Sequence, residues 1–320
     1  MGAPTPVQID LNPDGALAEP SDSMPAPGYS RIRLDVAYDG TGFFGWASQP
    51  GYQTVQGQIE EGLAAILTHY QPTPSLVVAG RTDAGVHALG QVAHFDLNPD
   101  QVHSLVRVKR GKGIPKYPNE LATMVQRRLG GILVTQPEIV IRRATLAAPG
   151  FDARFSALWR RYEYRISDTG ALRDPLQRFR TTWHGFALNL AAMQEAAATL
   201  IGLHDFATYC KPRPGATTIR TLQSFEWRRD PDGVLVATLQ ADAFCHSMVR
   251  ALVGACVSVG EGKLVGKRLV DLRVERARTS EFKVMQAQGL TLMEVGYPED
   301  AGLAIRAAQS RARRELPEDE

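Results

Sequence analysis

The sequence predicts an α+β protein with two ferredoxin-like βαββαβ halves, joined through a mainly antiparallel central sheet with helices on its outer face. Two observations lead to this fold class. The hydrophobic period switches between strand and helix spacing in the order βαββαβ, and that order occurs twice along the chain. In addition, 320 residues suffice for two domains that each bury a core. Because this fold hosts many activities, it leaves the function open.

The first half draws its elements from residues 31–146. Residues 31–38 alternate between apolar and polar side chains, which is typical of a half-buried strand. Thr54 is a suitable N-cap, and the apolar residues after it recur at helical spacing as far as residue 70. The remaining expected elements are two short strands (75–80 and 90–97), a helix (120–129) and a strand (138–146).

The second half repeats this order. Its expected elements are a strand (159–167), a helix (189–202), two strands (221–227 and 233–241), a helix (246–260), an extra helix (265–277) and a closing strand (290–298). The two middle strands are separated by RRDPDG, whose Asp, Pro and Gly favour a turn. The strand pair therefore reads as a hairpin.

The ends of the chain differ in composition from the part between them. Residues 1–29 are rich in Pro, Gly and Ala and contain no Lys or Arg, so we predict a disordered tail. Residues 301–320 are predicted to form a loose C-terminal tail. Between the tails we expect an N-terminal half, 30–147, that carries an acidic loop, and a C-terminal half, 148–300, that completes the site.

Composition excludes several classes of protein. No uninterrupted apolar stretch approaches the roughly 20 residues of a membrane span, and the N-terminus lacks the pattern of a signal peptide. We therefore expect a cytoplasmic protein without membrane association. Cys210, Cys245 and Cys256 are few and lack C-x-x-C spacing, so we interpret them as reduced, with neither a disulfide framework nor a zinc site.

Charge is distributed unevenly along the chain. The formal net charge is +2, but the segment from residue 30 to 297 holds 32 Lys and Arg against 24 Asp and Glu, a net charge of +8. A basic body suggests a polyanionic partner such as nucleic acid, although charges of this size also occur on proteins without one.

One loop, within AGRTDAGVHALGQVAHF (79–95), places a lone acid among small residues. Asp83 is followed by no second acid until Asp96, and the backbone around it is thin enough for a bulky group to approach. In an extended segment Arg81 lies on the same side as Asp83 and can keep it ionised. The alternative is a tight turn in which Asp83 caps backbone N–H groups and Arg81 faces water.

Three further stretches carry residues of chemical interest. The segment YDGTGFFGW (38–46) can offer stacking surface or simply pack in the core. In RRYEY, Tyr162 lies on one strand face and Arg161 on the other, so Tyr162 can stack on a base or belong to the core. Arg250, one turn into an apolar helix, needs a buried anionic partner such as Asp83, unless it lies on a solvated face.

These motifs together resemble the TruA-type tRNA pseudouridine synthases, in the same order and over residues 31 to about 297. The segments that carry the resemblance are YDGTGFFGW, TVQGQIEEGL, AGRTDAGVHALGQVAHFD, FDARFSALWRRYEYRI and FCHSMVRALVG. The resemblance implies a two-domain fold with a shared sheet, no cofactor, and a homodimer that binds the tRNA anticodon stem-loop. It also implies conversion of uridine to pseudouridine at tRNA positions 38, 39 and 40. By motif match, Asp83 corresponds to the nucleophilic aspartate, Arg81 and Arg250 to its charge partners, and Tyr162 to the tyrosine that stacks on the target base.

The required chemistry agrees with a single carboxylate. Pseudouridine formation breaks the N1–C1′ bond, turns the detached uracil and joins C5 to C1′. Most glycoside hydrolases need two carboxyl groups, whereas uracil leaves as a stabilised anion and needs less help. Two roles for Asp83 stay open, attack on the sugar as nucleophile and removal of a sugar proton to give a glycal-like intermediate.

The sequence departs from the family pattern after the first strand pair. Residues 101–116 form a basic insertion without acids after Asp100, and its cations are Arg107, Lys109, Arg110, Lys112 and Lys116. We hypothesise that this insertion extends the tRNA-binding surface, the alternative being a solvated loop. Further tRNA contacts are expected from Arg161 and from the loop 210–220, through Lys211, Arg213 and Arg220.

Two other functions compete with this interpretation. A non-catalytic RNA-binding module can stack bases on exposed aromatic residues, but it has no use for an acid aimed at a polyanion. A phosphoryl or glycosyl hydrolase would use Asp83 as a base and would need a metal or a second acid. Neither His87 nor His94 forms a recognisable ligand set with Asp83, so no metal site is predicted.

Overall fold

The structure, a computed structural model, describes residues 24–106, 119–213 and 217–311. The elements of its first half are β1 (Ser30–Tyr38), α1 (Val55–Ile66), β2 (Val77–Val78), β3 (His87–Leu97), α2 (Pro99–Val106), α3 (Asn119–Leu133) and β4 (Ile139–Leu146). All strands and helices predicted here are present, although β2 is shorter than expected. The unpredicted α2 begins with a reciprocal cap, because the side chains of Asn98 and Gln101 each accept the other's backbone N–H.

The second half contains more short elements than predicted. Its strands are β5 (Trp159–Ser167), β6 (Thr182–Trp183), β7 (Gly202–Asp205), β8 (Ile219–Arg229), β9 (Leu235–Ala241) and β10 (Leu290–Gly296). Its helices are α4 (Leu190–Ala198), α5 (Met248–Gly260), α6 (Gly266–Glu275) and α7 (Leu303–Arg311). Single-turn 3-10 helices, η1 (Pro175–Gln177), η2 (Ala207–Tyr209), η3 (Ala287–Gly289) and η4 (Asp300–Gly302), lie between them. The predicted helix 189–202 ends early, because β7 begins at Gly202.

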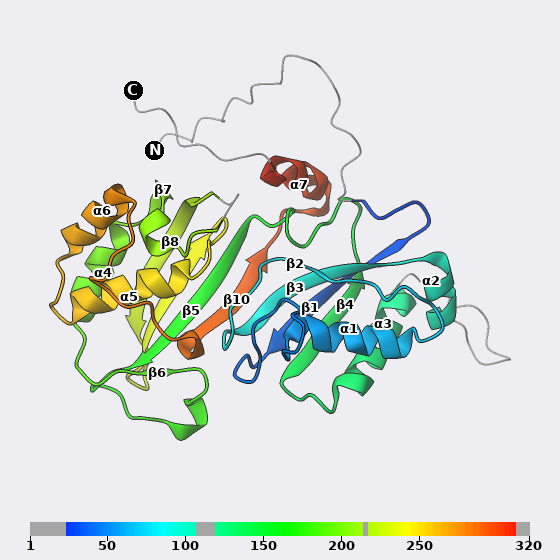
Figure 1. The fold of residues 1–320 in the computed structure, drawn as a ribbon, viewed down its shortest axis with the longest axis horizontal. Helices are drawn as coiled ribbons and strands as arrows, with labels where there is room; N and C mark the ends of the chain where they lie inside the picture. Colours follow the sequence, from blue (N-terminus) through cyan, green and yellow to red (C-terminus); the bar gives the residue numbers. More distant parts are fainter. Residues whose placement is uncertain (1–23, 107–118, 214–216, 312–320) are drawn as a thin grey trace, which may run out of the picture.

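In the described ranges all strands belong to one ten-stranded sheet with the path β4-β1-β3-β10-β5-β9-β8-β7, to which β2 and β6 add at β3 and β5. Neighbours along the path are antiparallel except β10 and β3, which run parallel with Thr291 opposite His87. Figure 1 shows β5 and β10 between the two halves. The prediction of a shared, mainly antiparallel sheet is confirmed, and β10 is the strand that joins its parts.

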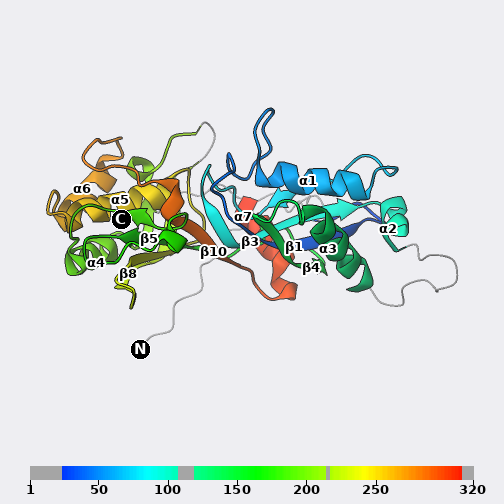
Figure 2. The ribbon, with the colours of Figure 1, turned by 90° about the horizontal axis from the view of Figure 1, so that it is seen from below.

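Helices pack against the sheet in both halves, as the two views show (Figures 1 and 2). In the first half Thr54 caps α1 as predicted, with its Oγ1 accepting the Gly57 N–H at 3.2 Å. In the second half α5 is buried along almost its whole length, since it is apolar on all sides and packs against α4 and β5. None of the helices in the described part is long and apolar enough to cross a membrane.

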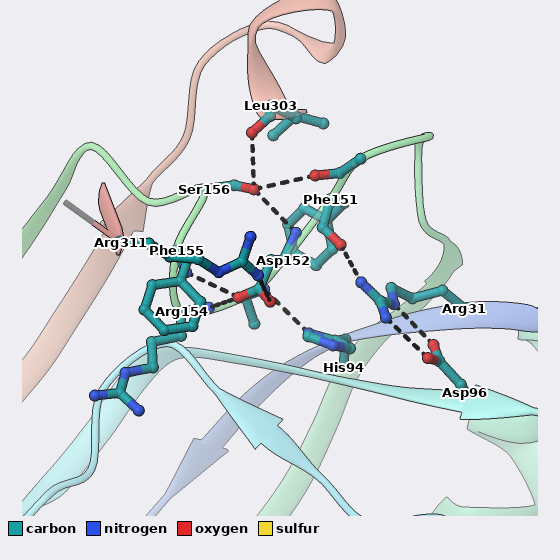
Figure 3. A network of polar contacts seen from close by, with 12 residues as sticks. Arg31, His94, Asp96, Phe151, Asp152, Arg154, Phe155, Ser156, Leu303 and Arg311 are labelled. Atoms are coloured by element: carbon teal, nitrogen blue, oxygen red, sulfur yellow. Dashed lines mark hydrogen bonds and ion pairs between the residues drawn. The ribbon is translucent and has the colours of Figure 1, made fainter. Parts of the chain in front are cut away.

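The segment between β4 and β5 is anchored on the first half by a buried polar network (Figure 3). Arg31 makes two hydrogen bonds to Asp96, at 2.7 and 2.8 Å, and donates a third to the Phe151 carbonyl at 2.7 Å. His94 Nδ1 accepts the backbone N–H of Ala153 at 3.0 Å. These contacts hold the start of the second half against β1 and β3.

The same network corrects the prediction of a loose C-terminal tail. Residues 303–311 form α7, with Leu303 and Ala307 buried one turn apart, and Ser156 donates a hydrogen bond to the Leu303 carbonyl. The helix-forming stretch LAIRAAQSR therefore outweighs the charge of the tail. Residues 1–23, 107–118 and 312–320 lie outside the described residues. The start of the basic insertion, residues 101–106, belongs to α2, and its cations lie outside the described part.

His94 should make the fold sensitive to acid. Burial, with the nearby charge of Arg31, lowers the pKa of His94 from 6.5 to about 4, which suits its role as acceptor. Because the unfolded chain takes up a proton first, stability should fall by roughly 3 kcal/mol as pH drops from 6.5 to 4. Urea unfolding across this range measures the effect. The control is His94→Asn, which retains an acceptor that does not titrate; an equally steep pH dependence in that variant would contradict the assignment.

Candidate active site

The Asp83 loop, residues 80–86 between β2 and β3, is held by the segment that follows β1. Trp46 N–H donates to the Thr82 carbonyl at 3.1 Å, and Gly85 N–H donates to the Phe43 carbonyl at 3.2 Å. This close approach requires glycine at position 45, whose φ is +91° and where a Cβ would lie 2.8 Å from the Thr82 oxygen. The two segments therefore fix each other.

Most aromatic residues of the 38–46 segment pack in the core. Tyr38, Phe43 and Trp46 are buried, whereas Phe44 is 53% exposed and is the ring of this segment that offers a stacking face. Tyr38 shares a hydrogen bond with Thr82 Oγ1 at 2.8 Å and accepts another from Gln91 at 3.2 Å. Burial raises the pKa of Tyr38 to about 12, so its hydroxyl supports the loop as a neutral group.

Asp83 is held by two side chains from the second half. Its Oδ2 lies 3.3 Å from Arg250 Nη1, and its Oδ1 lies 3.4 Å from His246 Nε2. Arg250 is itself oriented by a hydrogen bond from its Nε to the Met285 carbonyl at 2.8 Å. With 29% of its side chain exposed, Asp83 is anchored and still accessible. The predicted contact between Asp83 and Arg250 is present, 167 residues apart in the sequence.

His246 is a site residue that the sequence analysis missed. It lies two residues before α5 and four residues before Arg250, and the N-cap between them, Ser247, has a left-handed backbone with φ 65°. Helical spacing does not extend across such a cap, so the sequence offered no signal that would have placed His246 in the site. His246 and Arg250 approach Asp83 from one helix terminus.

The structure does not pair Arg81 with Asp83. Within the described residues, the ion pairs of Asp83 are those with His246 and Arg250, and Arg81 is exposed. Partial burial and the charges of Arg213 and Arg154 lower the pKa of Arg81. Arg81 is therefore an exposed cation of the loop, near the cations Arg154 and Arg213.

Tyr162 lies on β5 and is only 8% exposed. Its ring meets Phe244 edge-on, with centroids 5.2 Å apart. Burial raises the pKa of Tyr162, with smaller contributions in the same direction from Tyr38 and Asp83. The structure therefore places Tyr162 in the core, close enough to Asp83 for the charge of that carboxylate to act on its hydroxyl, and stacking of Tyr162 on a base stays a prediction.

A cavity of about 570 Å³ surrounds Asp83. Its walls come from both halves: Phe44, Ala47, Gln49, Thr82, Asp83, Ala84, Thr208, Tyr209, Cys210, Lys211, His246, Ser247, Arg250, Ala251, Arg278, Thr279, Phe282 and Val284. Among these described lining residues Asp83 is the one acid, facing two arginines, a lysine and a histidine. The cavity therefore combines one carboxylate with a cationic wall.

The residues predicted to contact tRNA differ in their surroundings. Lys211 lines the cavity and Arg213 is exposed beside it. Arg161 instead pairs with Glu294 and lies over the Trp159 ring. Arg220 is half-buried on β8 and donates to Thr217. The predicted contacts Lys109, Arg110 and Lys112 lie outside the described residues.

The structure pairs two of the three cysteines, which the sequence analysis did not expect. Cys210 and Cys245 form a disulfide across 35 residues of sequence, with their Cα atoms 5.8 Å apart, and Cys256 is free and buried. Local spacing gave no hint, because β8 and β9 bring the two segments together. In the described part of the chain, no group of three or more His, Cys, Asp or Glu is placed to hold a metal ion.

Comparisons with known proteins identify the class of enzyme. A family described as tRNA pseudouridine synthase matches residues 196–298. The tRNA pseudouridine synthase A of Leifsonia xyli is 61% identical over 287 residues, covering 90% of this chain and 98% of that protein. The proteins of the same name from Streptomyces griseus and Corynebacterium glutamicum are 51% and 44% identical, covering 91% and 90% of this chain and 96% of each relative. The chain belongs to the tRNA pseudouridine synthase family, and the resemblance is confirmed.

Proposed function

We propose that the protein isomerises uridine to pseudouridine at positions 38, 39 and 40 of the tRNA anticodon stem-loop, with Asp83 acting on the target nucleotide. The observation that carries the proposal is the single carboxylate in a cavity whose other charged groups are cationic. A polyanion is attracted to the cationic wall, whereas a purely binding surface gains nothing from an acid at its centre. This contrast favours the enzyme over an RNA-binding module.

Asp83 acts from a fixed position. Arg250 and His246 stand at its two carboxylate oxygens and orient the carboxylate in the cavity. The target uridine leaves its stack to enter the cavity, at a cost of a few kcal/mol that phosphate contacts offset. In one route Asp83 attacks C1′ as the N1–C1′ bond breaks, and C5 of the retained uracil then displaces the carboxylate from C1′. In the other route Asp83 removes a sugar proton as the N1–C1′ bond breaks, and it returns that proton when C5 joins C1′. In both routes the proton on C5 is lost to water.

Tyr162 supports this reaction as a neutral group. Because burial raises its pKa, the phenol keeps its proton at neutral pH and is a poor base for the C5 proton. We assign Tyr162 to contact with the uracil ring during its rotation. Arg81, Arg213 and Lys211 are assigned to the RNA backbone, with Arg161 and Arg220 as outer contacts and the basic insertion as an extension of this surface.

The assembly of the molecule follows the same proposal. The strand orders β4-β1-β3-β2 and β10-β5-β9-β8 support two ferredoxin-like halves, which we divide at residues 147 and 148. Two copies of the chain are proposed to bind one tRNA together, without a cofactor. The protein is proposed to act in the cytoplasm, where its tRNA substrate is found.

Release of tritium from C5 of uridine tests the reaction. With tRNA labelled at this carbon, the protein should release label to water, because C5 exchanges its hydrogen for the bond to C1′. Free uracil should not accumulate, which separates an isomerase from a glycoside hydrolase. Chelators should leave the rate unchanged. Retention of the label by tRNA that the protein demonstrably binds would contradict the proposed function.

A further inference from the structure

A second cavity lies beside the Asp83 loop. It measures about 530 Å³ and is lined by Thr41, Gly85, Arg178, Phe179, Trp183 and Gln288. The first cavity is lined by residues 82–84 of the same loop, and the second by Gly85. Since two residues span at most about 7 Å of chain, the second cavity begins within that distance of Asp83.

Two aromatic rings and the guanidinium of Arg178 form part of the wall of this cavity. Phe179 and Trp183 are each 44% exposed. The Arg178 guanidinium lies 4.0 Å from the centroid of the Phe179 ring, and that of Arg173 lies 4.9 Å from the Trp183 ring. No acid lines the cavity within the described residues. Partly exposed aromatic rings can stack on a nucleobase, and the arginines beside them can neutralise the phosphate of that nucleotide.

The wall is held in place by contacts to the main sheet. Gln288 donates hydrogen bonds to the carbonyls of Arg178 and, at 3.0 Å, Thr181. Thr182 pairs with Ile166 of β5, and its hydroxyl shares a hydrogen bond with Tyr164 at 2.7 Å. The segment that carries the two rings is thus tied to Gln288 and to β5, and a binding surface requires such support.

We propose that this cavity binds the base of a nucleotide adjacent to the target uridine, an inference that rests on the proposed RNA substrate. When the target base leaves its stack, its neighbour loses a stacking partner. The rings of Phe179 and Trp183 lie beside the Asp83 loop, which receives the target base, and they can replace the lost stacking partner. Arg178 is the charged residue among those lining this cavity in the described part of the chain, and its positive charge suits a nucleotide, which carries an anionic phosphate.

Equilibrium binding of a stem-loop RNA with a single target uridine tests this subsite without requiring catalysis. Trp183→Ala should raise the Kd for the intact RNA about 5- to 100-fold, and Phe179→Ala should act in the same direction. Phe186→Ala is the matched control, since Phe186 is more exposed but does not line the cavity; its Kd should change less than about two-fold.

Abasic RNAs identify the ligand. Each nucleotide flanking the target is made abasic in turn, and with one of these two RNAs the loss caused by Trp183→Ala should shrink to less than about three-fold. An equal loss with all three RNAs, or no loss at all, overturns the proposal. So does conversion of a dimer to a monomer by Trp183→Ala, which would make the surface a subunit contact. Because binding is measured, failure here is separate from failure to release tritium.

Discussion

Replacing Asp83 with Ala or Asn should abolish tritium release, lowering kcat by a factor on the order of 10⁴ or more, while tRNA binding stays within about ten-fold of the unmodified protein. The carboxylate is the one acid among the described residues lining the cavity, and neither substituent can attack a sugar carbon or accept its proton. Loss of an acid that faces RNA can even tighten binding, because one repulsive charge is removed.

The matched control for this experiment is Asp232→Asn. Asp232 lies in the turn between β8 and β9, at the end of the hairpin remote from Cys210 and Cys245, and pairs with Arg165. This substitution should leave kcat within about two-fold. An Asp83→Asn protein that keeps more than about a tenth of the activity would remove Asp83 from the chemistry, and the family membership would stand without it.

Arg160→Met should have the second largest effect, on both stability and rate. The Arg160 guanidinium is buried at the junction of three segments and donates to the carbonyls of Ala79 at 2.7 Å, Arg154 at 2.8 Å and Asp242 at 2.8 Å. Ala79 immediately precedes the Asp83 loop, and Asp242 follows β9. Methionine would leave buried carbonyls without these donors, at about 1–3 kcal/mol each. We expect a loss of about 3–5 kcal/mol in unfolding free energy.

A comparison of kcat values distinguishes two roles for Arg160, positioning of the Asp83 loop and support of the fold alone. Arg31→Met removes another buried arginine, one that bonds Asp96 and the Phe151 carbonyl away from the Asp83 loop. Both variants should be less stable in urea unfolding. At a temperature where both are folded, Arg160→Met should lower kcat about ten-fold or more, and Arg31→Met should lower it less than about two-fold. Equal kcat values would limit Arg160 to a structural role.

The fold could be predicted wherever the hydrophobic period was regular. β1, β5, α1 and α5 lie close to their expected ranges because burial of one face, or of a whole helix, imposes the pattern. β6 and β7 are too short to show a hydrophobic period. Their strand conformation depends on pairing with β5 and β8, which the sequence of the short segments does not reveal. α7 was missed because its acidic and basic flanks dominated the reading of the tail.

The candidate site could be predicted in part, for a different reason. Asp83 and Arg250 were paired because a lone acid and an arginine in an apolar helix each need a partner. Arg81 was misplaced because two residues of spacing say little about side-chain direction in a loop without regular dihedral angles. His246 and the disulfide Cys210–Cys245 depend on how β8, β9 and α5 meet, which no local pattern encodes.

The position of β10 has a consequence for biosynthesis. β10 is the last strand to leave the ribosome, yet it lies between β3 and β5 in the middle of the sheet. β2 pairs with β3 at Ala93 and His94, so until residues 290–296 have been synthesised the part of β3 at His87 and Ala88 has no strand on this side, and an unpaired edge invites aggregation. The two halves, and with them the walls of the Asp83 cavity, can therefore be joined through the sheet only after β10 has been synthesised.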